Sequence, residues 1–195
     1  MQVIGLTGSM ASGKSSVVRR IRTLLKWPIW DADAEVNKLY QCPIIIQRIL
    51  HQFPLAVTNQ GLDRQKLRYA VSEDSTALVK LESVLYPPLE ESRRRFLSHH
   101  QRLRTPVVLL DIPLLFENNL ENLFDLTVVI KCSEWLQKQR IMKRQGMKES
   151  LMQRLLARQM PQKEKQRRAD IIIDSNLNHH HTWIQFMTMV VGEKQ

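Results

Sequence analysis

Near the start of this 195-residue chain stands Leu6-Thr7-Gly8-Ser9-Met10-Ala11-Ser12-Gly13-Lys14-Ser15. Two glycines with four residues between them, followed by lysine and serine, complete the pattern of a phosphate-binding loop, or P-loop. The apolar run of residues 3–7 before it predicts a buried strand, and the apolar spacing over residues 14–26 after it predicts a helix. Strand, glycine-rich loop and helix in this order are the context that the pattern requires. We therefore predict a loop that holds the phosphates of ATP.

The residues of this loop have separate physical tasks in holding a triphosphate. Gly8 and Gly13 allow backbone N–H groups to approach phosphate oxygens closely, and the following helix adds the positive end of its dipole. Lys14 supplies a cation at the β- and γ-phosphates, and the Ser15 hydroxyl is placed to ligate Mg²⁺. The predicted ATP-binding residues of the loop are Gly8, Met10, Ala11, Ser12, Gly13, Lys14, Ser15 and Ser16.

Length and composition indicate one ordinary globular domain, with 43% hydrophobic and 25% charged residues. The longest apolar stretch, residues 107–116, is interrupted by Asp111 and Pro113 and is shorter than a membrane span. The N-terminus lacks the basic start of a signal peptide, and Cys42 and Cys132 lack a metal-binding or disulfide spacing. We expect a cytoplasmic protein without a membrane segment, whose oligomeric state the sequence leaves open.

The formal net charge of +10 is concentrated in residues 137–168, where eleven Lys and Arg face two Glu. Such a segment can be a solvated helix face, a nucleic-acid patch or a lid that grips phosphates. Arg140 and Arg144 lie one helical turn apart on one face and could reach ATP phosphates together. A guanine-reading Asn-Lys-x-Asp segment is absent from the sequence, which argues against a GTPase. A short chain with a basic helical pair is more typical of a small-molecule or nucleotide kinase.

Strands and helices alternate along the rest of the chain. Apolar runs predict further strands at 28–31, 107–112, 126–130 and 170–173, and helical spacing covers 135–144, 149–160 and 180–191. The stretch that follows Asp31-Ala32-Asp33, up to about residue 103, is mainly helical by its spacing, with a turn at 59–61 and a kink or break at Pro87-Pro88. This order predicts an α/β fold with about five parallel strands flanked by helices in three layers.

Six segments follow one another along the chain: the P-loop stretch 6–15, Asp31-Ala32-Asp33, Gly61-Leu62-Asp63-Arg64, Ile112-Pro113-Leu114-Leu115-Phe116-Glu117, Arg158-Gln159-Met160-Pro161 and Ala169-Asp170-Ile171-Ile172-Ile173-Asp174. By the order and spacing of these segments the sequence resembles the dephospho-CoA kinase family over nearly its whole length. The chain departs from the usual pattern at Ser9, Ala11, Asn37 and Tyr86.

The resemblance implies transfer of the ATP γ-phosphoryl group to the 3′-hydroxyl of dephospho-CoA, with Mg²⁺ as cofactor. It implies one P-loop kinase domain over 1–195, with a core of about 1–32, 104–136 and 169–195, a helical acceptor-binding region of about 33–103 and a lid of about 137–168. The implied partners are ATP and dephospho-CoA. Lys14 and Arg140 are expected in catalysis, Arg140 and Arg144 at ATP, and Asp33, Arg64 and Tyr86 at the acceptor.

The sequence offers two carboxylates for the catalytic base, Asp31 and Asp33, at the end of the second predicted strand. Phosphoryl transfer to a hydroxyl needs such a group, and ligands of open parallel sheets bind at the carboxyl ends of strands. Spacing cannot choose between the two, and the resemblance favours Asp33. The alternative is that they serve as a helix cap and a turn residue.

Two further carboxylates leave alternatives open. Asp111 ends a predicted strand and is either part of the metal surroundings or a polar strand end bonded to the P-loop. Glu117 is predicted to cap a following helix rather than to contact the edge of the active site.

Two functions compete with the one that the resemblance implies. Another small-molecule or nucleoside monophosphate kinase would use the same scaffold. A basic nucleic-acid-binding protein with a nucleotide-sensing P-loop belongs to a different class. It would bind DNA or RNA with a steep salt dependence, and its affinity would survive loss of Lys14.

Overall fold

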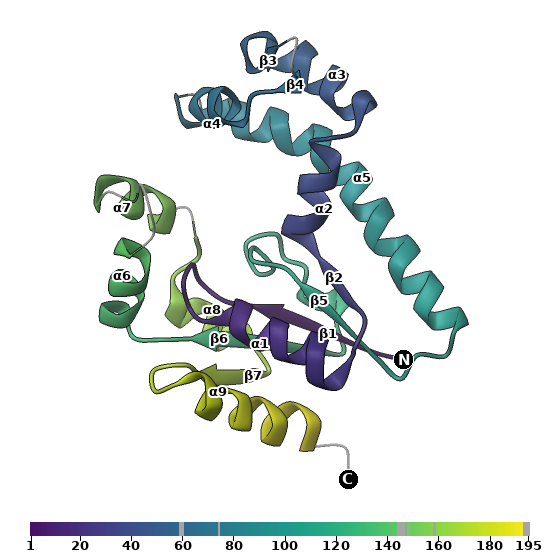
Figure 1. Ribbon diagram of the computed structural model, residues 1–195, viewed down its shortest axis with the longest axis vertical. Helices are drawn as coiled ribbons and strands as arrows, with labels where there is room; N and C mark the ends of the chain where they lie inside the picture. Colours follow the sequence, from purple (N-terminus) through teal and green to yellow (C-terminus); the bar gives the residue numbers. More distant parts are fainter. Residues whose placement is uncertain (59–60, 74, 144–146, 148, 158, 193–195) are drawn as a thin grey trace. The chain divides into compact units, whose positions relative to one another are not determined.

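The computed structural model of the chain describes residues 1–58, 61–73, 75–143, 147, 149–157 and 159–192 (Figure 1). The chain divides into two compact units. The core unit comprises Met1–Trp30 and Arg104–Gln195, and the helical unit comprises Asp31–Leu103.

The core unit is built on the predicted five-stranded sheet. Its strands are β1 (Gln2–Thr7), β2 (Ile29–Asp31), β5 (Val107–Asp111), β6 (Leu126–Lys131) and β7 (Ile171–Asp174). They lie in the order β2-β5-β1-β6-β7, and β1 pairs in parallel with both β5 and β6. Leu6 is opposite Asp111 in this register, so the end of β5 lies beside the start of the P-loop.

Helices cover both faces of this sheet. The elements of the core unit besides the strands are α1 (Lys14–Arg20), η1 (Ile21–Leu25), η3 (Glu121–Leu123), α6 (Glu134–Met142), α7 (Glu149–Ala157), α8 (Gln162–Arg168), α9 (His179–Phe186) and η4 (Met187–Val191). Alternate strand residues such as Ile4 and Leu6 pack with Val17 of α1 and Phe186 of α9 on one face (Figure 1). On the other face Gly5 lies against Leu115, and α8 contacts β6.

The sequence explains why these strands are central. Every residue of β5 is buried, as is the middle of β6, which suits apolar β-branched runs covered on two faces. The phosphate loop follows the central strand of the sheet, at a carboxyl edge where parallel α/β sheets bind ligands. A parallel sheet with helices on both faces is the three-layer arrangement that was predicted.

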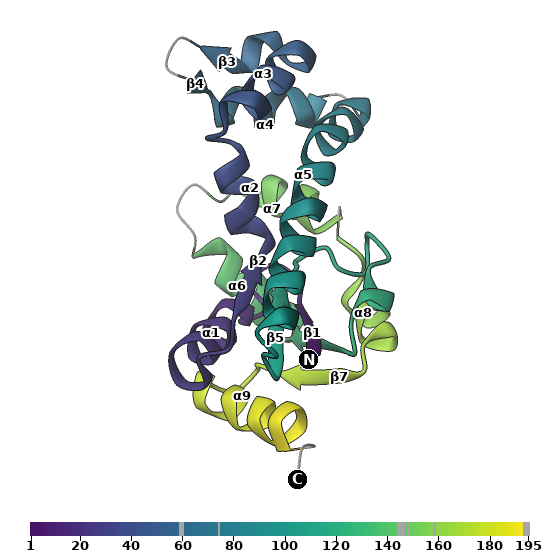
Figure 2. The same cartoon turned by 90° about the vertical axis from the view of Figure 1, so that its right-hand side faces the viewer.

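The helical unit has its own apolar core. Its elements are α2 (Ala32–Leu39), α3 (Pro43–Gln52), η2 (Pro54–Ala56), β3 (Val57–Thr58), β4 (Gly61–Leu62), α4 (Arg64–Glu73) and α5 (Ser75–Arg102) (Figure 2). Ile49, Leu67 and Leu81, from three of its helices, are buried in one cluster. The antiparallel pair β3–β4 was not predicted, and of the predicted turn between them Asn59 and Gln60 lie outside the described residues.

The helices differ from the sequence predictions at two places. A kink or break was predicted at Pro87-Pro88, and the structure has no break there, since α5 runs through both prolines. Each proline removes one helical hydrogen bond, but Leu81 and Leu85 anchor the preceding turns in the cluster of the helical unit. Helix α8 was missed because Gln-Lys-Glu-Lys-Gln-Arg-Arg shows no apolar spacing at all.

A search of the helices in the described part of the chain finds no segment long and apolar enough to cross a membrane.

Candidate active site

The P-loop joins β1 to α1 and has the strained backbone of a functional loop. A Cβ on Gly8 would lie 2.6 Å from the Ile130 carbonyl oxygen, so a side chain has no room there. Gly13 has φ +98°, and Ala11 has φ 61°, which costs energy for a residue with a side chain. Strain of this kind persists where surrounding contacts hold the loop in one shape.

Lys14 and Asp111 form an ion pair at the end of the central strands. The Lys14 ammonium donates to Oδ1 of Asp111, and the two side chains are 14% and 8% exposed. The contact agrees with the interpretation of Asp111 as a polar strand end bonded to the P-loop. A triphosphate would offer the Lys14 cation a second set of anionic oxygens.

Arg140 reaches the outer side of the P-loop from α6. Ser133 is the N-cap of this helix, and its hydroxyl accepts from the Leu136 N–H. The Arg140 guanidinium donates to the Ala11 carbonyl oxygen at 3.4 Å and to the Ser175 carbonyl oxygen at 3.0 Å. The Arg140 side chain therefore contacts the backbone of the loop. Arg144, its predicted companion at ATP, lies outside the described residues, as does Arg158.

Cys132 lies next to the part of the P-loop that Arg140 contacts. Its side chain is buried, and its Sγ is 4.0 Å from the Ala11 carbonyl oxygen. Burial raises the pKa of the Cys132 thiol, an effect that the nearby Arg140 cation partly opposes. Cys132 is accordingly a packed, protonated thiol, and Cys42 is also free.

Two glutamine side chains form hydrogen bonds with the backbone of Met10. Gln137 of α6 donates from Nε2 to the Met10 carbonyl oxygen at 2.8 Å. The Met10 N–H donates to Oε1 of Gln159 at 3.0 Å. Sequence reasoning missed both contacts. Gln159 could have been noticed because it belongs to the segment 158–161 that carries the resemblance, whereas Gln137 has no such signal.

A buried ion pair between Lys165 and Glu117 lies near the end of β1, the strand that leads into the P-loop. The ammonium of Lys165, which is 0% exposed, lies 2.8 Å from Oε1 of Glu117. The same oxygen accepts from the Met160 N–H at 2.9 Å. The Pro113 carbonyl oxygen accepts from Lys165 at 3.4 Å and from the Thr7 hydroxyl at 3.0 Å. Side chains thus connect the end of β1 with the chain after α7.

The predicted capping role of Glu117 is wrong. The residues after Ile112 form turns rather than the helix that Glu117 was expected to cap. No helix offers N–H groups to the Glu117 carboxylate at this place. The carboxylate pairs instead with the Lys165 cation, which is buried and therefore requires a charged partner.

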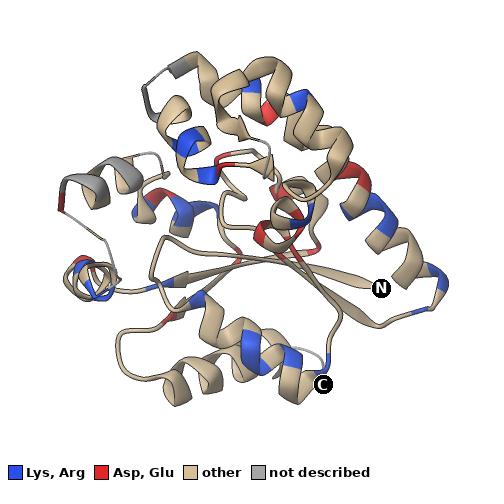
Figure 3. Ribbon diagram, turned by 45° about the horizontal axis from the view of Figure 1, so that its top comes forward, with Lys and Arg blue, Asp and Glu red and all other residues tan. Residues whose placement is uncertain are grey.

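Part of the basic segment 137–168 is paired with carboxylates. Lys138 contacts Glu149, and Arg168 contacts Glu121. Figure 3 shows that Asp and Glu lie among the Lys and Arg of the described helices. Pairing reduces the field that an unpaired basic stripe would offer to nucleic acid.

In the helical unit the two candidate carboxylates have different surroundings. Asp31 is the N-cap of α2, with Oδ1 accepting from the Ala34 N–H at 3.0 Å. Asp33 lies in the first turn of α2 and is exposed. The capping role that the sequence left open thus belongs to Asp31.

Arg64 is held by neutral groups. It starts α4, donates from Nη1 to Oδ1 of Asn37 at 2.8 Å, and its guanidinium lies 5.1 Å from the centre of the Tyr40 ring. Burial raises the pKa of the Tyr40 hydroxyl, and the charges of Arg64 and Arg68 partly offset that rise. Within the described part of the chain, Arg64 has no carboxylate partner, so its charge is available to an anion. Tyr86, the other predicted acceptor residue, is 41% exposed on α5.

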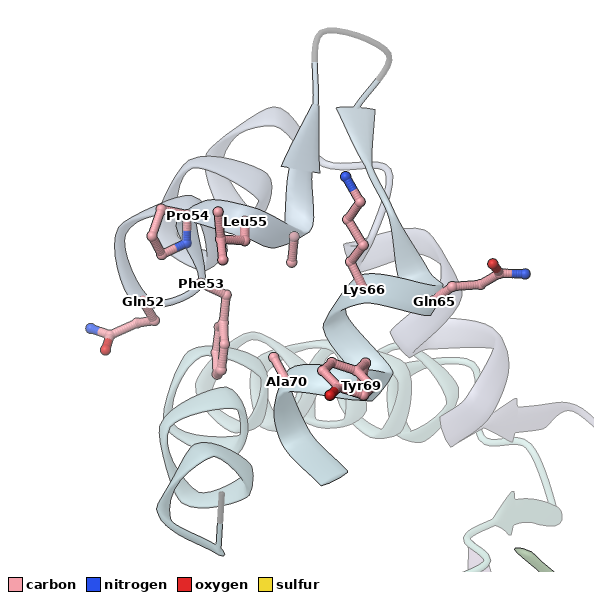
Figure 4. Close-up of a pocket in the computed structure, with 9 residues that line it drawn as sticks. Gln52, Phe53, Pro54, Leu55, Gln65, Lys66, Tyr69 and Ala70 are labelled. Carbon is pink, nitrogen blue, oxygen red and sulfur yellow. The ribbon is translucent and has the colours of Figure 1, made fainter. Parts of the chain in front are cut away.

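The helical unit also contains a pocket of about 870 Å³ (Figure 4). Phe53, Leu55 and Tyr69 contribute to its mainly apolar lining, and Lys66 stands at its edge. None of the predicted acceptor residues Asp33, Arg64 and Tyr86 lines it.

Comparison with known proteins gives a consistent result. The family model described as dephospho-CoA kinase matches residues 2–181. The dephospho-CoA kinase of Bradyrhizobium diazoefficiens is 38% identical over 176 residues, covering 90% of this chain and 87% of the relative. That of Bartonella quintana is 34% identical over 190 residues, covering 97% of each chain. A solved structure from Thermus thermophilus has a TM-score of 0.86 and 30% identity, covering 100% of this chain and 98% of the other.

Proposed function

This chain belongs to the dephospho-CoA kinase family, and we propose that the candidate active site carries out the corresponding phosphoryl transfer. The chain is an ATP-dependent kinase that phosphorylates dephospho-CoA in coenzyme A biosynthesis. The observation that carries the proposal is a complete P-loop between β1 and α1 whose Lys14 cation lies against Asp111. The hydroxyl that receives the phosphoryl group is the ribose 3′-hydroxyl.

ATP binds with its phosphates on the P-loop. The backbone N–H groups of Ala11 and Gly13 and the start of α1 face phosphate oxygens, and Lys14 neutralises the β- and γ-phosphates. In the transfer, the acceptor oxygen forms a bond to the γ-phosphorus while the bond from that phosphorus to the β,γ-bridging oxygen breaks, releasing ADP. Arg140 stabilises the charge on the transferred group. It reaches that position by leaving its carbonyl contacts at Ala11 and Ser175.

Asp33 accepts the proton of the acceptor hydroxyl. This role is supported by the exposed position of Asp33 in the first turn of α2, where Asp31 already serves as the N-cap. Arg64 binds acceptor phosphate through the charge that Asn37 and Tyr40 leave uncompensated, and Tyr86 borders the acceptor.

Mg²⁺ is proposed as the cofactor, and the donors present fit it. Ser15 offers a hydroxyl in the first turn of α1, and Asp111 offers a carboxylate beside Lys14. The described residues contain no group of three His, Cys, Asp or Glu placed to hold a metal. An ion that keeps several waters needs few protein ligands. When bound, Mg²⁺ would neutralise phosphate charge. We place the activity in the cytoplasm.

The acceptor is tested by competition. Purified protein with ATP and Mg²⁺ is offered dephospho-CoA, AMP and CMP, separately and together, and ADP formation is followed in a coupled assay. We expect turnover with dephospho-CoA and less than 1% of that kcat/KM, about a 3 kcal/mol discrimination, with either monophosphate. A monophosphate that outcompetes dephospho-CoA would transfer the assignment to a nucleoside monophosphate kinase.

A further inference from the structure

Three successive carbonyl groups on the outer side of the P-loop accept hydrogen bonds from side chains. The Met10 carbonyl oxygen accepts from Gln137 Nε2 at 2.8 Å, and that of Ala11 accepts from Arg140 at 3.4 Å. The Ser12 carbonyl oxygen accepts from the Ser175 hydroxyl at 2.5 Å. The donors come from α6 and from the residue that follows β7.

The outer donors are themselves fixed in place. Gln137 is 7% exposed and Ser175 is 3% exposed. The Ser175 N–H donates to the Lys131 carbonyl oxygen at 2.8 Å, which ties it to the end of β6. The Ser175 hydroxyl also accepts from Arg140 Nη1 at 3.1 Å, so one side chain contacts both the loop and the arginine.

These bonds determine which way the loop's N–H groups point. In a planar trans peptide the C=O of one residue and the N–H of the next point in opposite directions. Carbonyls of residues 10–12 that face outward therefore turn the N–H groups of Ala11, Ser12 and Gly13 toward the inner side of the loop. The Ser12 N–H donates to the Ser9 carbonyl oxygen. Those of Ala11 and Gly13 meet no acceptor among the residues that the structure describes.

We propose that Gln137 and Ser175 are positioning residues, which hold the P-loop amides in the orientation that binds the ATP phosphates. The inference rests on the proposed ATP-dependent function, and it adds residues that neither touch substrate nor belong to the P-loop. A loop already held in its bound shape loses less conformational freedom when a ligand binds. Loss of either donor should therefore weaken ATP binding and leave the chemical step nearly unchanged.

The test measures ATP affinity and turnover in two variants, Gln137→Leu and Ser175→Ala. Each removes one side-chain donor to a loop carbonyl. Calorimetric titration with ATP and Mg²⁺ should show Kd raised about tenfold, the effect of one such hydrogen bond. The KM for ATP should rise in parallel, with kcat within about twofold of the parent protein and the KM for dephospho-CoA unchanged.

Gln162→Leu is the matched control. Gln162 also donates from Nε2 to a backbone carbonyl of the core unit, but that carbonyl belongs to Cys132 at 2.7 Å. We expect this variant to bind ATP with the parent Kd. If the control variant binds ATP as weakly as the two test variants, the effect reflects general loosening of the core, and the proposal is overturned.

Other outcomes also decide the question. Unchanged ATP affinity in a folded Ser175→Ala or Gln137→Leu variant contradicts the proposal, as does a lower kcat with unchanged Kd. Ser175→Ala removes a single oxygen and carries the test if Gln137→Leu does not fold. The calorimetry needs no acceptor, so a parent protein that binds ATP but does not phosphorylate dephospho-CoA would overturn the proposed function and leave this inference standing.

Discussion

Replacing Lys14 by methionine is expected to lower kcat/KM for ATP about 1,000-fold. The variant keeps most of the apolar stem of the side chain but removes the cation that stabilises charge on the transferred phosphoryl group. A preorganised donor at such a position typically contributes about 100- to 1,000-fold to the rate. Initial rates at several ATP concentrations, with dephospho-CoA at saturation, measure the effect.

Loss of Lys14 also leaves the buried Asp111 carboxylate without this ion-pair partner, which could unfold the protein rather than disable it. The double variant Lys14→Met with Asp111→Asn removes both charges. We expect it to recover thermal stability without recovering turnover. Arg19→Ala removes an exposed cation from the same helix and should change kcat/KM less than twofold. A Lys14 variant within tenfold of the parent rate would contradict the assigned role.

Replacing Asp33 by asparagine is expected to lower kcat about 100-fold while the Kd for ATP stays the same. Asparagine keeps the size of the side chain but cannot accept the proton of the attacking hydroxyl, and general bases typically contribute 100- to 10,000-fold. Single-turnover rates isolate the chemical step, and calorimetry measures ATP binding separately.

Asp31→Asn is the matched control for this prediction. Asparagine is as good an N-cap as aspartate, so the contact with the Ala34 N–H can persist and α2 should remain stable. We expect turnover within about threefold of the parent, since a cap contributes about 1 kcal/mol to stability and nothing to proton transfer. If Asp31→Asn loses the chemical step and Asp33→Asn retains it, the base is Asp31.

The sheet could be predicted from sequence because its order depends on local signals. Val107–Asp111 and Leu126–Lys131 are apolar runs that are buried on both faces, and each coincides closely with a predicted strand. Helix α8 and the short pair β3–β4 could not be found in this way. Segments of seven and two residues without apolar periodicity are fixed by the tertiary contacts around them.

The P-loop and its contacts likewise include residues that the sequence reveals and residues that it does not. The glycines, Lys14 and Ser15 follow from a contiguous pattern whose chemistry is known. Gln137 and Ser175 are separated from the loop by more than a hundred residues and carry no motif, so only the fold brings them to its carbonyls. The helix that Glu117 was expected to cap does not form, and Glu117 pairs instead with the buried cation of Lys165. This pairing could not be foreseen because α8, which carries Lys165, has no apolar spacing.

The reaction itself is tested by identifying its product. The parent protein is incubated with ATP, Mg²⁺ and dephospho-CoA, and the products are separated and examined by mass spectrometry and by phosphorus NMR. We predict equal amounts of ADP and of a product that carries one added phosphate on the ribose 3′-oxygen. Phosphate released to water, a phosphate at another hydroxyl, or no product from a folded sample would contradict the proposed transfer.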